Sequence, residues 1–404
     1  MSYLSELRVN WRYVTAAAIG LGSGHMFNMY LASIFAPHLL HEFGWTKAQF
    51  ALIGLTILSG AIFMPIAGRI TESLGTRKAA TIGVISSPII YVLLATMTGS
   101  FAWFMLLCMV QLMLVGSFTT VMVYNRLVAE QFVHTRGLAL AITACTPSIT
   151  AAAAAPVLSM FVEQEGWRAG YFALAALVTV GGVAALLMIP AGGGDSGGGS
   201  KRSVAQDYPA LLRDRAFQIL CASKLLCGVT LMVFTSQLQL ILIDRGMKPE
   251  QAALLISTYA VATIGGRFFG GLALDRFPSH IIGVLGFGIV PAIAFLVLGA
   301  GFESPALLAA TVLVLGLAFG ADGNITAYLL MRHFRFEVFS TVYSLVSVAI
   351  AISASAGAVL ASATIRASGG FGLFFLIASA MVLVGGLLAG FLGRLPAAVR
   401  PAAR

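Results

Sequence analysis

Charged residues are scarce in this 404-residue sequence, in which Asp, Glu, Lys and Arg together make up 10% of the residues. Soluble domains contain about 25% charged and 45–50% apolar residues, whereas 59% of the residues are apolar here. An ordinary soluble protein is therefore excluded. The apolar residues form continuous runs instead of alternating with polar ones, which also argues against a membrane-spanning β-barrel. The composition indicates an all-α membrane protein whose helices cross the bilayer many times.

Cysteine is equally sparse, and its placement excludes several kinds of site. All four cysteines (Cys108, Cys145, Cys221 and Cys227) lie in apolar runs, where cysteine usually acts as a small hydrophobic residue. Neither a disulfide framework nor a metal site is indicated, and no cofactor is expected. The sequence also lacks a Ser/His/Asp, Cys/His or phosphate-loop constellation, and its polar segments are too short to hold a catalytic domain. We therefore expect neither an enzyme nor a receptor.

Twelve membrane-spanning helices follow from the length of the apolar runs. The apolar fraction amounts to roughly 238 residues, and each span needs about 20. A Gly/Ser-rich stretch, which begins AGGGDSGGGSKR, is typical of a flexible linker and divides six runs from six. We expect an N-terminal six-helix bundle at 1–190, a linker at 191–215 and a C-terminal six-helix bundle at 216–404. The expected spans are 12–36, 49–70, 78–99, 102–129, 137–160, 168–190, 216–242, 251–275, 280–300, 305–332, 338–364 and 370–393.

The basic residues predict which side of the membrane holds each loop. Of the 24 lysines and arginines, sixteen fall on the side that contains both termini, five fall on the other side, and three lie inside the spans. Because cytoplasmic loops are enriched in Lys and Arg, both termini are expected in the cytoplasm of a cell whose inner or plasma membrane holds the protein. The net charge of +9 is then a matter of topology, and no nucleic-acid partner is expected.

The two halves resemble each other at a nearly constant spacing. FGWTKAQFAL from Phe43 aligns with RGMKPEQAAL from Arg245, which pairs Gly44 with Gly246 and Gln49 with Gln251 at an offset of 202 residues. Two further matches, Glu72 with Asp275 and Tyr171-Phe172 with Phe374-Phe375, follow at an offset of 203. Parallel repeats of this kind are typical of alternating-access transporters.

A charged motif occupies the connection between the expected spans 49–70 and 78–99. The segment GRITESLGTRK (68–78) resembles the loop signature of the major facilitator superfamily, G-x-x-x-D-R-x-G-x-R-R. Gly68, Gly75 and the basic pair that starts at Arg77 match, whereas Glu72 replaces the aspartate and Ser73 the first arginine. Asp275 and Arg276 belong to a second copy in the C-terminal half. The resemblance implies a gating loop whose acidic and basic side chains hold helices together in one state.

Within that superfamily the sequence is most similar to monocarboxylate transporters and oxalate:formate-type antiporters. The similarity is diffuse and rests on EFGWTKAQ (42–49), RGLALAI (136–142), GWRAGYFALAAL (166–177) and GGRFFGGLALDRF (265–277). It implies that Arg267 contacts a substrate carboxylate. Thr263 stands where monocarboxylate transporters usually have an aspartate, Met29 lies in the region of their first-helix lysine, and 340–364 lacks the antiporter lysine. Substrate identity and proton coupling therefore do not carry over from the family.

The charges inside the expected spans favour an anionic ligand independently of the resemblance. Arg126, Lys224 and Arg267 are the three bases, and Asp322 is the clearest acid. Each such charge costs about 2.5–3.5 kcal/mol at a helix centre, so the surplus bases need water, a partner or an anion. Alternatives remain for each base. Arg267 can pair with Asp275, Arg126 can pair with Glu130, and Lys224 can extend toward the cytoplasmic interface.

Asp322 and several neutral polar residues complete the expected pathway. Asp322 lies in GLAFGADGN (316–324), where glycines and polar side chains weaken the helix, and it is expected to act either as a proton carrier or as a static counter-ion to a base. His25, Asn28, Tyr30, Tyr124 and Asn125 are expected to contact substrate together with Arg267 and Arg126, although His25 can equally be a buried structural residue.

We therefore expect a monomeric secondary transporter for a mono- or aromatic carboxylate. Its partners are expected to be the organic anion, protons by symport and the lipid bilayer. The alternative is a carboxylate exchanger, or a small-molecule efflux carrier, on the same fold. A cationic drug is a less suitable cargo because bases outnumber acids inside the spans.

Overall fold

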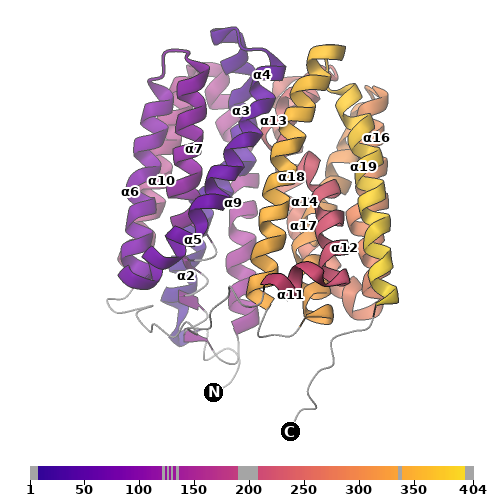
Figure 1. The fold of residues 1–404 in the computed structure, drawn as a ribbon. Helices are drawn as coiled ribbons and strands as arrows, with labels where there is room; N and C mark the ends of the chain where they lie inside the picture. Colours follow the sequence, from indigo (N-terminus) through magenta and orange to yellow (C-terminus); the bar gives the residue numbers. More distant parts are fainter. Residues whose placement is uncertain are drawn as a thin grey trace.

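The computed structural model describes residues 8–120, 123–124, 127–128, 131–132, 136–189, 208–334 and 339–395. Every regular element in these ranges is helical. Figure 1 shows two groups of long helices side by side, which we call the N-terminal half (11–188) and the C-terminal half (208–394). The predicted all-α membrane architecture is confirmed by eleven described helices that are long and apolar enough to cross a membrane.

The helices of the N-terminal half lie at the expected spans, with two larger differences: the first span is broken, and α7 ends at Phe118 where a span of 102–129 was expected. They are α2 (Trp11–Gly22), α3 (His25–Phe43), α4 (Lys47–Ala51), the 3₁₀ helix η1 (Leu52–Thr56), α5 (Ile57–Leu74), α6 (Thr76–Ala95), α7 (Phe101–Phe118), α9 (Arg136–Glu165) and α10 (Trp167–Met188).

The C-terminal half repeats this pattern and begins with a short helix inside the predicted linker 191–215. Its helices are α11 (Tyr208–Arg213), α12 (Arg215–Cys227), the 3₁₀ helix η3 (Gly228–Thr230), α13 (Leu231–Asp244), α14 (Pro249–Arg276), α15 (Ser279–Gly283), the π-helix η4 (Val284–Ile289), α16 (Val290–Ala300), α17 (Pro305–His333), α18 (Phe339–Ser368), α19 (Gly372–Gly390) and η6 (Phe391–Arg394).

The first expected span differs from the prediction because it is broken. α2 ends at Gly22 and α3 begins at His25, with Gly24 in an extended conformation between them. Only glycine fits at this position, because a Cβ at Gly24 would lie 2.6 Å from the backbone oxygen of Thr119. This first span is therefore not among the eleven described helices that are long enough to cross a membrane. The expected number of twelve spans stays a prediction.

The predicted repeat is visible in the turns. Glycines with positive φ angles follow matching helices: Gly44 (65°) and Gly246 (80°), Gly99 (97°) and Gly301 (85°), and Gly166 (86°) and Gly369 (78°). Each pair is separated by 202 or 203 residues, as the sequence match requires, and glycine adopts this left-handed region without steric cost. Capping repeats as well, because Gln49 accepts a hydrogen bond from the Thr46 N–H and Gln251 accepts one from the Lys248 N–H.

Among the described residues, the largest contacts between the halves involve three sets of helices. α3 packs on α13, α9 packs on α14, and α18 packs on α4, η1 and α5. The α18–η1 contact is close, since a Cβ at Gly54 would lie 2.6 Å from the Cβ of Ala358. Figure 1 shows that α3, α4, α13 and α18 come together at the upper end of the molecule.

A charged contact closes this upper end. Lys47, the first residue of α4, forms an ion pair with Asp244, the last residue of α13, and its ammonium lies 5.9 Å from the centroid of the Phe371 ring. The side chains of the pair are 30% and 28% exposed. The pair therefore joins the two halves at a partly hydrated position next to the α3–α4 turn.

A second ion pair near this end stays within the N-terminal half. Glu42, at the end of α3, accepts hydrogen bonds from the indole N–H of Trp167 and from the guanidinium of Arg168, both on α10. These two hydrogen bonds, Trp167 first, lower the pKa of the Glu42 carboxyl below its ordinary value. Arg168 also stacks at 4.2 Å from the centroid of the Trp167 ring.

Candidate functional site

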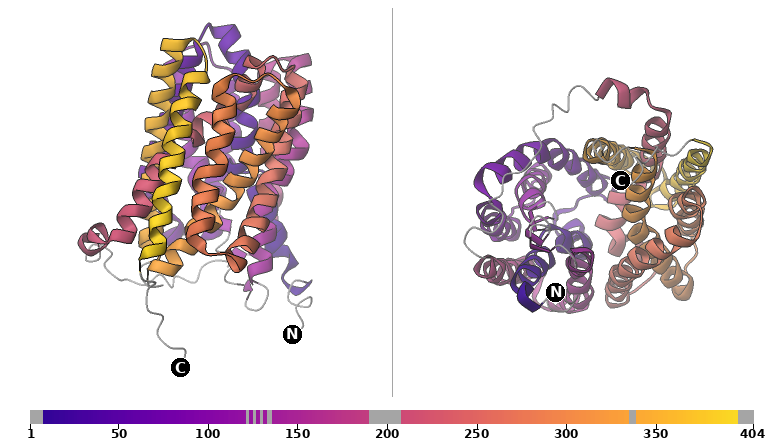
Figure 2. Two further views of the ribbon diagram at one scale, coloured as in Figure 1. Left: turned by 90° about the vertical axis from the view of Figure 1, so that its right-hand side faces the viewer. Right: turned by 90° about the horizontal axis from the view of Figure 1, so that it is seen from below.

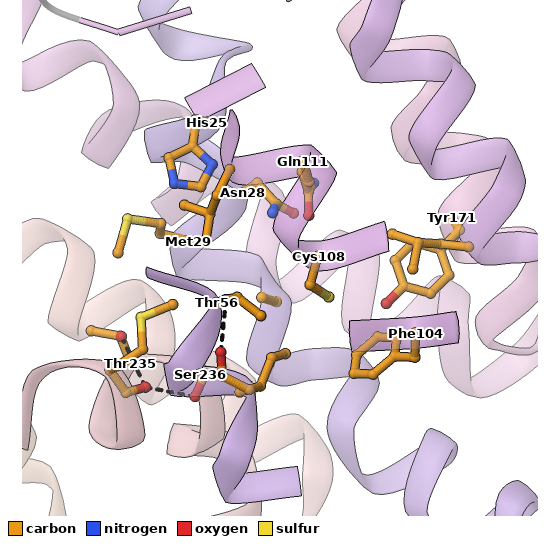
Figure 3. Close-up of a pocket in the computed structure, with 15 residues that line it drawn as sticks. His25, Asn28, Met29, Thr56, Phe104, Cys108, Gln111, Tyr171, Thr235 and Ser236 are labelled. Atoms are coloured by element: carbon orange, nitrogen blue, oxygen red, sulfur yellow. Dashed lines mark hydrogen bonds between the residues drawn. The ribbon is translucent and has the colours of Figure 1, made fainter. Parts of the chain in front are cut away.

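A cavity lies between the halves on the α13 side of α3. It is lined from α3, η1, α6, α7, α10 and α13 and has an empty volume of about 640 Å³, which includes its open mouth. Figure 3 shows His25, Asn28 and Met29 of α3 on one side and Thr235 and Ser236 of α13 on the other. We call this space the α3–α13 cavity.

Two of the predicted substrate residues, His25 and Asn28, line the α3–α13 cavity. His25 is 8% exposed, and its Nδ1 has no hydrogen-bond partner among the described residues. Its backbone N–H donates to Thr119 Oγ1 at 2.9 Å, which anchors the start of α3 after the break. The imidazole therefore lines the cavity with one nitrogen buried and without a described partner.

Tyr30 faces away from this cavity, toward the contact of α3 with α9 and α14. Its hydroxyl lies 2.9 Å from Ser148 Oγ and 3.1 Å from Thr263 Oγ1, and these two oxygens are 3.0 Å apart. Thr263 also donates to the carbonyl of Ala260 at 2.7 Å. Three hydroxyl protons cannot serve four contacts. The assignment that leaves out the longest contact is a chain from Tyr30 to Ser148, then to Thr263 and to the Ala260 carbonyl.

Arg267 lies one helical turn beyond Thr263 on α14. It is half-buried and donates from Nη1 to the carbonyl of Ala144 on α9, so its guanidinium also lies at the contact between the halves. It forms no ion pair with Asp275 or with any other described carboxylate. Arg267 does not line the α3–α13 cavity. A guanidinium carries five N–H donors. None of those of Arg267 is paired with a carboxylate of the described residues.

Lys224 and Asp322 form a buried ion pair inside the C-terminal half. Lys224 Nζ on α12 lies 2.6 Å from Asp322 Oδ1 on α17 and 3.5 Å from the centroid of the Phe287 ring. The Lys224 side chain is 2% exposed and that of Asp322 is 36% exposed. Lys224 therefore does not extend to the interface, and Asp322 acts as the counter-ion of a lysine.

A second, smaller cavity adjoins this ion pair. It has an empty volume of about 280 Å³ and is lined by Asp322, by Thr230 of η3 and by Gly286 and Phe287 of the π-helix η4. The 3₁₀ helix η3 and the π-helix η4 therefore both border this cavity. Irregular backbone at membrane depth is tolerated where it is buried in protein or lines a cavity, and π-helical turns often occur at functional sites.

The other predicted substrate residues do not join these groups. Tyr124 is fully buried in the core between α2 and α6, with its ring against Gly20, and its hydroxyl has no partner among the described residues. Asn125 and Arg126 lie outside the described residues, as does the alternative partner Glu130.

The predicted gating loop is a tight turn in the structure. Gly68 and Glu72 belong to the end of α5, Gly75 adopts a φ of 81°, and Arg77 lies in the first turn of α6. The side chain of Glu72 lies outside the described part of the chain. Asp275 and Arg276 end α14. Arg77, Asp275 and Arg276 are exposed, and none of the three forms an ion pair with a described side chain.

Several polar residues of the cavity were not predicted from the sequence. They are Thr56, Gln111, Thr235 and Ser236. Gln111 had a usable signal, because it is the only amide in the apolar helix FAWFMLLCMVQLMLVGSF. The three hydroxyl residues gave no such signal in the sequence, since Ser and Thr are common in helices, where they form hydrogen bonds to their own backbone.

The comparisons with known proteins agree with this architecture. The model of the Major Facilitator Superfamily matches residues 18–278. Among solved structures, a bacterial homologue of the human lysosomal transporter Spinster, in an inward-facing and occupied conformation, is 14% identical, with 96% of this chain and 97% of that chain covered and a TM-score of 0.74. No curated protein matches the chain.

Two further solved transporters have the same fold. The nucleoside transporter NupG is 13% identical over 96% of this chain and 98% of its own, with a TM-score of 0.74. A D-xylose-proton symporter is 16% identical over 97% of both chains, with a TM-score of 0.71. At these identities the similarity shows the fold alone.

Proposed function

The chain belongs to the Major Facilitator Superfamily, so it is a membrane transporter and not an enzyme, and from that premise we propose that it carries an organic carboxylate by alternating access. The sequence similarity to monocarboxylate transporters and oxalate:formate-type antiporters supports this substrate class. The neighbouring structures have a sugar and a nucleoside in their names, so the fold itself does not select a carboxylate.

The charge balance inside the helices is the observation that carries the proposal. Lys224 is neutralised by Asp322 at 2.6 Å, whereas Arg267 has no carboxylate partner among the described residues. A guanidinium matches a carboxylate with two parallel hydrogen bonds. Arg267 also lies where α14 meets α9, so an anion bound there touches both halves and is exposed when they separate.

Proton symport is the second part of the proposal, and it is assigned to the Lys224–Asp322 pair. Protonation of Asp322 removes the counter-ion of a lysine that is 2% exposed, and an uncompensated buried charge is unfavourable by several kcal/mol. The proposal requires that the anion bound at Arg267 also lowers the cost of the unpaired Lys224 charge. A proton and a carboxylate therefore bind more favourably together than separately, which is the thermodynamic requirement for cotransport.

The orientation of the described state follows from the predicted topology. With both termini in the cytoplasm, the Lys47–Asp244 end faces outward and the exposed Arg77, Asp275 and Arg276 face the cytoplasm. On this topology we infer an inward-facing state, which the ion pair between the outer ends of the two halves supports. Rocking of the halves around α9 and α14 would expose the site to the other side.

Reconstituted vesicles test the substrate class. Purified protein in liposomes should accumulate labelled lactate, benzoate or oxalate, and Arg267→Ala should abolish uptake of whichever acid is carried. Arg267→Lys keeps the charge but loses the two-pronged contact, so it should retain part of the activity. Arg366→Ala, at an exposed position on α18, is the matched control. Normal affinity in Arg267→Ala would show that the site is elsewhere.

The same vesicles separate symport from exchange. An inward proton gradient should drive accumulation in the wild type, and Asp322→Asn should uncouple uptake from that gradient. Counterflow that ignores the gradient would instead favour the exchanger, for which the same Arg267 site serves both directions.

A further inference from the structure

No charged side chain is among the described residues that line the α3–α13 cavity, although the cavity adjoins the contact between the halves. Its polar lining consists of His25, Asn28, Thr56, Gln111, Thr235 and Ser236. An anion there has no cation to pair with, so the carboxylate proposed above does not explain this cavity.

The hydroxyl groups of the cavity have already used their protons. Ser236 Oγ donates to the Met232 carbonyl at 2.6 Å, Thr235 Oγ1 to the Leu231 carbonyl at 2.8 Å and Thr56 Oγ1 to the Ile53 carbonyl at 2.7 Å. Some of these hydrogen bonds are drawn in Figure 3. A hydroxyl group has one proton and two lone pairs. Each of the three oxygens therefore keeps lone pairs that can accept a hydrogen bond, whereas the amides of Asn28 and Gln111 supply the N–H donors of the lining.

The opposite wall is aromatic. Phe104 of α7 and Tyr171 of α10 line this side of the cavity (Figure 3). His25 adds a buried nitrogen that has no described partner. The space thus offers an apolar, ring-sized wall on one side and unused hydrogen-bond acceptors on the other.

We propose that the α3–α13 cavity binds an uncharged, hydroxyl-bearing part of the transported molecule, so that the substrate is a hydroxylated organic acid, preferably an aromatic one. The acceptor oxygens on η1 and α13 receive the ligand hydroxyl, and the aromatic wall packs on its ring. A carboxylate in this position would face these oxygens with no cationic side chain among the described lining residues to balance its charge. The acidic end of the substrate is left to Arg267, and this assignment alone depends on the function proposed above.

Matched ligand pairs provide the test. The first pair of probes is 4-hydroxybenzoate and benzoate. The second pair is 4-hydroxybenzamide and benzamide, two amides that lack the carboxylate. Their dissociation constants are measured on the purified full-length protein. The hydroxylated member of each pair should bind roughly 2- to 10-fold more tightly, the range of a net hydrogen bond.

Substitutions locate the effect. Ser236→Ala and Thr235→Val should remove the preference for the hydroxylated member while leaving benzoate and benzamide unchanged, and Thr235→Ser should restore it. Thr311→Val is the control, because Thr311 also bonds to a carbonyl one turn earlier but lines neither cavity described here. Arg267→Ala should weaken both acids and neither amide.

The outcomes distinguish the two proposals. Equal affinity within both pairs, or no binding of any probe, overturns the hydroxyl site. A hydroxyl preference that survives Ser236→Ala and Thr235→Val places the hydroxyl elsewhere and overturns it as well. A preference in the amide pair with no advantage of acid over amide keeps the hydroxyl site and refutes the carboxylate function.

Discussion

Removing Asp322 should cost more stability than removing its partner Lys224. Asp322→Asn leaves an ammonium that is 2% exposed without a counter-ion, whereas Lys224→Met leaves a carboxylate that is 36% exposed and can be hydrated or protonated. Breaking a buried pair costs about 3–5 kcal/mol. We expect the lower end, about 3 kcal/mol, for Asp322→Asn, because the Phe287 ring still holds the ammonium by a cation–π contact.

A double-mutant cycle measures the interaction itself. The Lys224→Met and Asp322→Asn double variant should recover most of the loss, since no charge is then buried. The exposed pair of Arg168 and Glu42, whose side chains are 46% and 39% exposed, is the internal standard and should show a coupling below about 1 kcal/mol. Unfolding free energies from detergent titration, followed by tryptophan fluorescence, give both cycles.

Two results would refute this reasoning. Equal coupling energies in the buried and the exposed cycle would mean that burial of Lys224 does not amplify the interaction. A smaller loss in Asp322→Asn than in Lys224→Met would mean that the charge left behind is accommodated regardless of its exposure.

Three further outcomes follow from other contacts. Gly320→Ala should destabilise the protein by about 1–3 kcal/mol, because its Cβ would lie 2.1 Å from a backbone oxygen of α14, whereas Gly323→Ala, with open space around its Cβ, should be tolerated in the same unfolding assay. The lowered pKa of Glu42 predicts stability that is present above the ordinary glutamate pKa of about 4.3 and lost as the pH falls through the lower folded value; unfolding midpoints in Glu42→Gln should lose this dependence. Lys47→Ala should open the upper end, and exchanging Lys47 and Asp244 should close it again, as measured by spin-label distances across the pair; unchanged distances in Lys47→Ala would assign closure to apolar packing alone.

The sequence predicted the helices well because bilayer-length apolar runs leave little alternative for the backbone. It also predicted that Lys224, Arg267 and Asp322 needed partners, since charge inside a span is unfavourable. It could not identify the partners. Lys224 and Asp322 are 98 residues apart, and which face of α12 meets which face of α17 depends on helix rotation, which hydropathy does not encode.

The substrate residues were harder to predict for the same reason. His25 and Tyr30 lie five residues apart on α3, yet one lines the α3–α13 cavity and the other bonds to α9 and α14. Tyr124 is a polar aromatic residue of the kind expected to line a transport pathway. It is buried in the core instead, where Gly20 leaves room for its ring. A polar residue in a membrane span needs either a hydrogen-bond partner or a cavity. The sequence indicates that need, but it does not show which of the two the residue has.

The six paired glycine turns all join helices at the end where Lys47 meets Asp244. A connection of a few residues with a left-handed glycine has little slack, so the two helices that it joins cannot slide past each other independently. Each half then behaves mechanically as three stiff hairpins hinged at this end. Opening it requires whole hairpins to swing apart, and the amplitude is limited by how far the opposite ends can approach before their side chains touch.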